Sequence, residues 1–169
     1  LINRTVQAAV LETTARHILT EGLPYDRCQV GVVMAMPPAT GLEDLYITEA
    51  DQLPNVVRTQ VDVVLTGGAA VLNADDADVA GLADYCDGEV LLFGLDPEGE
   101  ALRAHRARKG RAVWARAATI VLATGTQESP LINLSAPVFS PITNEPPEDV
   151  RPQVLAAVAA AWSLGVSPD

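Results

Sequence analysis

Acidic and amide side chains follow apolar, strand-like runs at two places in this 169-residue sequence. Glu12 ends the apolar run 6–12, and Asn73, Asp75 and Asp76 follow the run 69–72. In α/β folds, ligand groups gather at the carboxyl ends of strands, where a carboxylate can accept the hydroxyls of a ribose. Asp75 or Asp76 would equally serve as the N-cap of the helix that follows. The residues themselves therefore leave a nucleotide contact and a helix cap both open.

The sequence lacks the loop that usually holds the phosphates of a nucleotide. That loop has the pattern Gly-x-x-x-x-Gly-Lys-Ser/Thr, because backbone amides and one lysine surround the phosphates. Lys109 is the only lysine of the chain, and Gly110 and Arg111 follow it. We therefore expect no ATP hydrolysis by this chain in isolation.

Charge is abundant and unevenly distributed. The formal net charge of −11 argues against binding to a nucleic acid, because phosphates would be repelled. The basic residues concentrate between positions 103 and 116, at Arg103, Arg106, Arg108, Lys109, Arg111 and Arg116. Such a cluster either attracts an acidic partner or forms one solvated face of a helix, and we favour the solvated face.

The composition is that of one globular domain over residues 1–169, with 49% apolar residues. The longest apolar stretch, 154–166, is too short to span a bilayer, and no signal peptide opens the chain. Because residue 1 is Leu, we expect the numbering to begin inside a longer protein. Cys28 and Cys86 show no metal or redox spacing, so we expect free thiols and a cytoplasmic protein.

Strand-like and helix-like segments alternate along the chain. The predicted strands are residues 6–12, 29–34, 61–65, 69–72, 89–94, 112–116, 119–123 and 128–134. The predicted helices begin near residues 48 or 51, 75 or 76, 102 and 152, residues 15–22 form a short helix or a loop, and 137–147 is a Pro-rich loop. This order predicts an α/β fold, with a mostly parallel sheet flanked by helices and a small antiparallel patch near residues 110–135.

Several runs, in one order, resemble the cyanophycin synthetase family. They are residues 8–13, 18–23, 25–33, 58–65, 71–76, 86–90, 95–97, 104–106, 111–113 and 155–165. Each run is modest by itself, but together they cover nearly the whole chain. The chain is thus similar to the Mur-ligase-like C-terminal half of that family, as a fragment or a degenerate member.

The resemblance implies a fold and a reaction. The fold would be the C-terminal portion of a Mur ligase central domain, without the P-loop segment that precedes it or the Mur C-terminal domain that follows. The family uses ATP and Mg²⁺ to activate a carboxylate as an acyl phosphate, which an amine then attacks. The Mur-like half attaches arginine to the side chains of a polyaspartate backbone, so arginine and polyaspartate or cyanophycin are the implied partners.

The resemblance also implies roles for individual residues. Glu12 matches the glutamate that binds Mg²⁺, and Asn73, Asp75 and Asp76 match a loop near the nucleotide. Gln153 stands where the family has an asparagine that contacts adenine. These positions are the candidate metal ligand and the candidate nucleotide contacts.

The chain departs from the family pattern at three further places. Residues 14–17 replace Ala-Arg-Gly-Gly, no histidine lies between His17 and His105, and Val57 stands at the position of a modified lysine. The sequence thus leaves open whether the chain is itself an enzyme. The alternatives are a non-catalytic scaffold or dimerisation remnant and a small-molecule binding module. Missing segments of the same protein or a homo-oligomer would be its protein partners.

Overall fold

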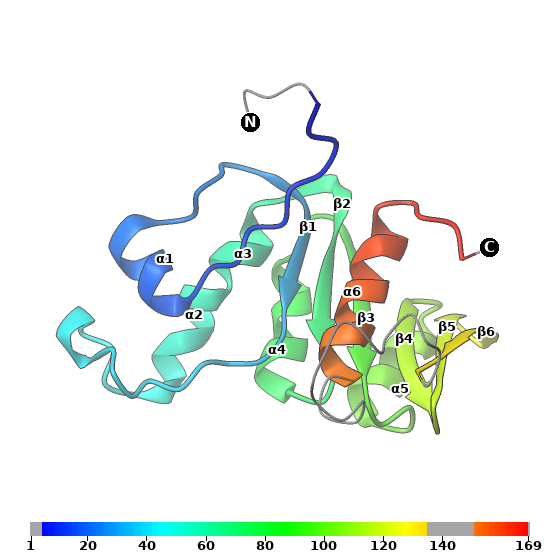
Figure 1. Cartoon of the computed structure of the whole chain (residues 1–169). Coiled ribbons are helices and arrows are strands. Elements are labelled where there is room, and N and C mark those ends of the chain that lie inside the picture. Colours follow the sequence, from blue (N-terminus) through cyan, green and yellow to red (C-terminus); the bar gives the residue numbers. More distant parts are fainter. Residues whose placement is uncertain (1–4, 135–150, 169) are drawn as a thin grey trace.

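A computed structural model describes residues 5–134 and 151–168 as one sheet flanked by helices (Figure 1). The strand order follows the chain, from β1 to β6. Strands β1 to β4 pair in parallel, and β4, β5 and β6 pair antiparallel. The bounds are β1 Cys28–Val33, β2 Val64–Asn73, β3 Glu89–Gly94, β4 Arg111–Arg116, β5 Thr119–Thr124 and β6 Gln127–Asn133. The predicted α/β class and its antiparallel patch are confirmed.

Helical segments connect the strands and cover both faces of the sheet. Their bounds are α1 Ala15–Glu21, η1 Glu43–Leu45, η2 Ala50–Gln52, α2 Leu53–Val57, α3 Thr59–Asp62, α4 Ala77–Gly81, η3 Leu82–Tyr85, α5 Glu100–Ala107 and α6 Arg151–Ser163. In the parts of the chain that the structure describes, no helix has the length and apolarity to cross a membrane. The predicted loop at 137–147 lies outside the described residues.

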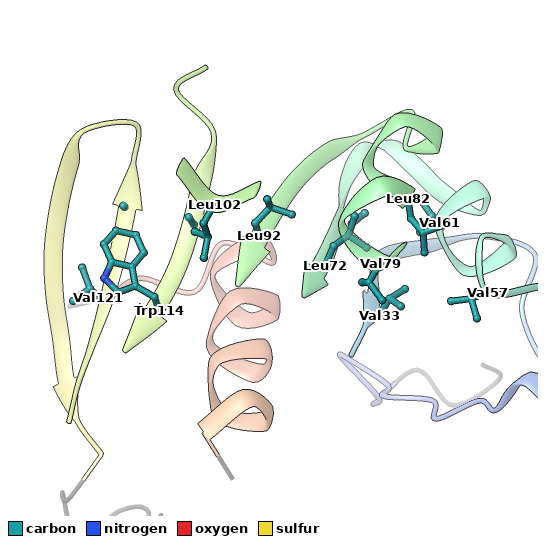
Figure 2. Packing of buried hydrophobic residues seen from close by; sticks show 13 residues of the cluster. Val33, Val57, Val61, Leu72, Val79, Leu82, Leu92, Leu102, Trp114 and Val121 are labelled. Atoms are coloured by element: carbon teal, nitrogen blue, oxygen red, sulfur yellow. The ribbon is translucent and has the colours of Figure 1, made fainter. Parts of the chain in front are cut away.

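The two faces of the sheet bury separate apolar clusters. On one face, Leu72, Leu92 and Trp114 pack with residues of α3, α4, η3 and α5. On the other face, Val71, Leu91 and Phe93 pack against α6. Figure 2 shows the first cluster on the side of the sheet turned away from α6. Neighbouring residues of one strand point to opposite faces, so one apolar run serves both layers.

A smaller apolar cluster lies beside the sheet, on the side of β1 (Figure 1). It joins α1, the η1 region and α2 through Ala15, Leu42, Ile47, Leu53 and Val56. On the surface, Arg16 of α1 makes an ion pair with Asp44 of η1, with 2.8 Å between Nη2 and Oδ1. The segment from α1 to α2 thus has its own small core.

The predicted strand over residues 6–12 is wrong, because this segment forms no strand. Val6, Val10 and Leu11 are exposed at 42%, 98% and 51%. An apolar run becomes a strand only where a neighbour satisfies its backbone groups, and among the described residues β1 pairs only with β2. Residues 6–12 pair with no described strand.

The predicted turn at Gly67 and Gly68 is also wrong. One continuous strand, β2, passes through both glycines, and Val61 lies in α3. The register with β1 shifts from the pair Cys28 and Val64 to the pair Val30 and Ala69, so the extra residues form a bulge. A Cβ on Gly68 would overlap the carbonyl oxygen of Gln29, and glycine permits this approach.

Candidate functional site

The polar residues predicted at the end of β2 lie together at the carboxyl edge of the sheet. Asn73 ends β2, and its Nδ2 donates to the carbonyl oxygen of Met34, just beyond β1, at 2.8 Å. Its Oδ1 accepts the backbone N–H of Asp75 at 3.0 Å. Asn73 therefore joins the ends of β1 and β2 and sets the direction of the loop that carries both aspartates.

Asp76 is the N-cap of α4. Its Oδ1 accepts the backbone N–H groups of Asp78 and Val79 at 3.1 and 3.2 Å. Its Oδ2 accepts the backbone N–H of Met36 at 2.9 Å. The cap that we considered for this position is confirmed, and the same carboxylate also fixes the segment after β1.

Asp75 reaches the end of the next strand, β3. Its Oδ2 accepts the backbone N–H of Leu95 at 2.6 Å, and its Oδ1 lies 3.5 Å from the backbone nitrogen of Asp96. A Cβ on Gly94 would stand 2.8 Å from that Oδ1, so a glycine there leaves room for the carboxylate. Asn73, Asp75 and Asp76 thus tie together the loops after β1, β2 and β3.

Gln153 lies exposed on the first turn of α6. Trp162 lies near the other end of α6, and the Arg111 guanidinium lies 4.6 Å from the centre of its ring. Arg111 is the first residue of β4. The end of α6 therefore lies at the amino edge of the sheet. A helix rises ~1.5 Å per residue, which carries Gln153 back toward the carboxyl edge. No hydrogen bond among the described residues joins Gln153 to Asn73, Asp75 or Asp76.

Glu12 is exposed in the segment before α1. Within residues 5–134 and 151–168, no three side chains of His, Cys, Asp or Glu gather closely enough to hold a metal ion. Its role as a Mg²⁺ ligand stays a prediction.

Two of the residues at which the chain departs from the family pattern, His17 and Val57, make contacts within the fold. His17 lies exposed on α1, where its Nδ1 is 3.1 Å from Oγ1 of Thr14, the N-cap of that helix. Val57 is 3% exposed and packs in the core under the sheet.

Lys109 lies at the opposite edge of the sheet from the aspartates. It follows α5 with a positive φ of 66° and immediately precedes β4, at the amino edge. A strand rises ~3.3 Å per residue, so the six residues of β4 separate the two edges by about 20 Å. Lys109 therefore cannot join Asp75 and Asp76 around one triphosphate.

Half of the basic cluster makes ion pairs that the sequence alone did not reveal. Arg106 and Arg116 both contact the Glu128 carboxylate at 2.7 Å, and Arg111 pairs with Glu89 at 2.5 Å. The two arginines lower the pKa of Glu128, and the hydrogen bond from Arg116 has the larger effect. Arg103, Arg108 and Lys109 are exposed, in agreement with the favoured solvated face.

A surface pocket of about 530 Å³ lies away from these residues, between α1, the loop before β1 and α3. It is lined by Ile18, Gly22, Leu23, Tyr25, Asp26, Arg27, Thr59 and Val63, and so contains none of the predicted site residues.

Cys28 and Cys86 are free thiols. Burial, and secondarily Cys86, raises the pKa of Cys28, which disfavours its reactive thiolate.

The fold and these loops define an α/β protein with a mostly parallel sheet, whose polar residues converge at the carboxyl edge. The cyanophycin synthetase of Synechocystis sp. is 34% identical over 168 residues, covering 96% of this chain and 18% of that relative. The cyanophycin synthetase of Crocosphaera subtropica is 39% identical over 109 residues, covering 64% of this chain and 12% of the relative. The chain belongs to the cyanophycin synthetase family, of which it matches a segment.

The chain spans 12% to 18% of the length of the curated relatives that it matches. No family model matches it. Among solved structures, the UDP-N-acetylmuramoylalanyl-D-glutamyl-2,6-diaminopimelate–D-alanyl-D-alanyl ligase from Acinetobacter baumannii is similar with a TM-score of 0.49 and 17% identity. That similarity covers 82% of this chain and 26% of the other.

Proposed function

We propose that this chain is a segment of an ATP-dependent, amide-bond-forming ligase of the cyanophycin synthetase type, which adds arginine to a polyaspartate backbone. The match to the Synechocystis relative over 96% of the chain supports this assignment. The segment would be the C-terminal portion of a Mur ligase central domain, in a cytoplasmic protein whose other segments complete the active site. Two free, half-buried thiols agree with a reducing compartment.

The carboxyl edge is the part of the chain that would face a nucleotide. Asn73, Asp75, Asp76 and Gln153 would lie on the nucleoside side of ATP, and Glu12 would bind Mg²⁺. When bound, ATP supplies the phosphoryl group that activates a carboxylate for attack by an amine. These roles are those that the family resemblance assigns to the five positions.

The residues of this chain do not by themselves fit a triphosphate. Both aspartate side chains already accept backbone N–H groups, from Met36, Asp78 and Val79 and from Leu95. A triphosphate needs cations and free backbone amides around it, and the only lysine lies at the opposite edge. That separation of Lys109 from the carboxyl edge is the observation on which the inactivity of the isolated chain depends.

The test is titration calorimetry of the isolated chain with Mg-ATP, followed by a phosphate-release assay with arginine and an aspartate peptide. We expect no heat of binding and no release above the rate without protein. Circular dichroism of the same sample serves as the control that the chain is folded. A micromolar dissociation constant, which corresponds to a binding free energy of about −8 kcal/mol, would contradict the proposal, and so would steady phosphate release.

A non-catalytic scaffold or dimerisation element is the second candidate. Buried Val57 favours it, because Val57 stands where the resemblance implies a modified lysine. The coding sequence upstream of Leu1 distinguishes the two candidates. A Gly-Lys-Thr phosphate loop there supports the ligase segment, and a gene that starts at this point supports the scaffold.

A further inference from the structure

The indole of Trp114 carries a hydrogen-bond donor that its protein surroundings do not satisfy. Trp114 lies on β4 and is fully buried. No group of the described residues accepts the hydrogen on its Nε1, and no other buried side-chain nitrogen or oxygen in those parts of the chain is left in this way. Because an unsatisfied buried donor is costly, folded proteins give nearly every such group a protein acceptor or an ordered water.

The apolar neighbours of Trp114 cannot accept this hydrogen. Trp114 pairs with Val121 of β5, and both pack in one cluster with Leu102 of α5 and with Ala123. Figure 2 shows the indole nitrogen on the side of the ring nearest Val121. The backbone carbonyls of paired strands point sideways within the sheet, where the N–H groups of neighbouring strands occupy them. The acceptor must therefore come from a polar side chain beyond Val121 or from a bound molecule.

Glu128 of β6 brings a carboxylate to this part of the same face. It pairs with Ala123, so its side chain lies on the face that carries Trp114. The Arg106 guanidinium contacts both groups, since its central carbon lies 4.4 Å from the centre of the Trp114 ring and its Nη2 lies 2.7 Å from Glu128 Oε1. Each Glu128 oxygen accepts one arginine, from Arg106 or Arg116, and a carboxylate oxygen can accept a second hydrogen bond.

We infer that one water molecule is bound between Trp114 and Glu128, accepting the indole N–H and donating to the carboxylate. A water spans about 5.5 Å between two polar groups, because each of its hydrogen bonds measures about 2.8 Å. It can therefore join two groups that are held near each other without touching. A cation at this place would be repelled by the two arginines and an anion by Glu128, so a neutral ligand that both accepts and donates fits best.

The water completes a polar cluster that fastens the hairpin of β5 and β6 to α5. Arg106 of α5 donates to the Gly125 carbonyl in the turn of that hairpin at 3.1 Å, as well as to Glu128. Arg116 reaches the same carboxylate from β4 at 2.7 Å. All of these groups belong to β4, α5 and the hairpin, so the site needs no residue from outside the described part of the chain.

A crystal structure of the 169-residue chain at about 1.5 Å resolution tests the inference, because ordered buried waters are visible there. We expect a water within about 3.2 Å of both Trp114 Nε1 and a Glu128 oxygen. A direct hydrogen bond from Nε1 to a protein oxygen, or the lack of a water beside Nε1, overturns the inference.

Hydrogen exchange of the indole N–H, followed by nuclear magnetic resonance, gives a second test in solution. Glu128→Ala removes the second partner of the water and should speed exchange at Trp114 at least ~10-fold. Glu128→Gln keeps an acceptor oxygen and should stay within about threefold of the wild type. Both variants lose the ion pairs, so the comparison isolates the acceptor. Equal exchange at Trp114 in the two variants overturns the inference.

Glu89→Ala is the matched control at the second tryptophan of the chain. Glu89 pairs with Arg111, whose guanidinium lies over the Trp162 ring. The substitution should leave exchange at Trp114 within about twofold of the wild type, and Trp162→Phe assigns the two indole signals. A response of Trp114 to Glu89→Ala as large as that to Glu128→Ala overturns the inference as well.

Discussion

Single carboxylates in this chain connect segments that are distant in sequence. Asp76 caps α4 and holds Met36, while Asp75 holds the residues after β3. Hydrogen bonds from backbone amides to a carboxylate are charge-assisted and stronger than those between neutral groups. The loops of the candidate site are therefore fixed before any ligand arrives.

Substitution of Asp76 should destabilise the fold. Asp76→Ala removes the cap of α4 and leaves the Met36 N–H without its acceptor, which should lower the free energy of unfolding by about 1–3 kcal/mol. Urea denaturation measures the change. Asp78→Ala on the same helix is the control, and it should cost below about 0.5 kcal/mol because Asp78 is exposed. Equal losses in the two variants would refute the double role of Asp76.

His105 should make stability depend on pH. Burial lowers its pKa from the ordinary 6.5, although the Arg111 carbonyl, 3.1 Å from Nε2, opposes the shift. Arg108 lowers the pKa further and Glu89 raises it. At pH values between the lowered pKa of His105 in the folded chain and about 6.5, the unfolded chain binds more protons than the folded chain. The free energy of unfolding therefore falls as the pH falls through this range.

Denaturation at a series of pH values from about 7 to about 5 checks this dependence. His105→Gln should remove part of the loss of stability at the acidic end. His17→Gln, at the exposed histidine of α1, is the matched control and should retain the wild-type slope. A slope unchanged by His105→Gln would contradict the assignment.

At the scale of elements, α6 is the helix that covers one face of the parallel strands. Leu155 and Ala159 are fully buried against Val71, Leu91 and Phe93. Arg111 links the last turn of α6 to the start of β4 and to Glu89. Amino acids far apart in the chain thus set the direction of this helix, and with it the place of Gln153.

Leu155→Ala should test this packing. Removal of a fully buried leucine leaves a cavity and typically costs about 2–5 kcal/mol. Gln153→Ala, on the exposed side of the same helix, should change stability by less than about 0.5 kcal/mol. The measurement is urea denaturation followed by circular dichroism. A small loss for Leu155→Ala would mean that α6 is not packed on the sheet.

At the scale of the whole molecule, the excess of negative charge opposes the compact state. The chain carries 22 acidic and 11 basic residues, and three of the basic side chains, Arg106, Arg111 and Arg116, pair with Glu89 and Glu128 around β4 to β6. The excess acidic groups repel one another across the surface, and this repulsion weakens as salt shortens its range.

Salt should therefore stabilise the protein. An increase from about 0.02 to about 0.2 M sodium chloride should raise the melting temperature by a few degrees, because screening of the net repulsion exceeds the loss in exposed ion pairs. A thermal scan at constant pH measures this. Sodium chloride and potassium chloride should act alike, and a lower melting temperature in salt would contradict the charge argument.

The sequence by itself determined the local elements and the class of fold. The apolar run at 89–94 became β3 with the predicted bounds, and the hairpin of β4 and β5 formed where expected. The family followed from the order of short motifs. In these cases, the signal is contained in adjacent residues, through apolar periodicity, turn residues and helix caps.

Only the tertiary structure decided what depends on partners distant in sequence. Residues 6–12 have the apolar content of a strand and yet lie exposed, while the two glycines that suggested a turn lie inside β2. The same holds for the candidate site, since only the sheet places Lys109 at one edge and Asp75 and Asp76 at the other. Strand pairing is non-local, because a neighbouring strand rather than the run itself satisfies its backbone groups.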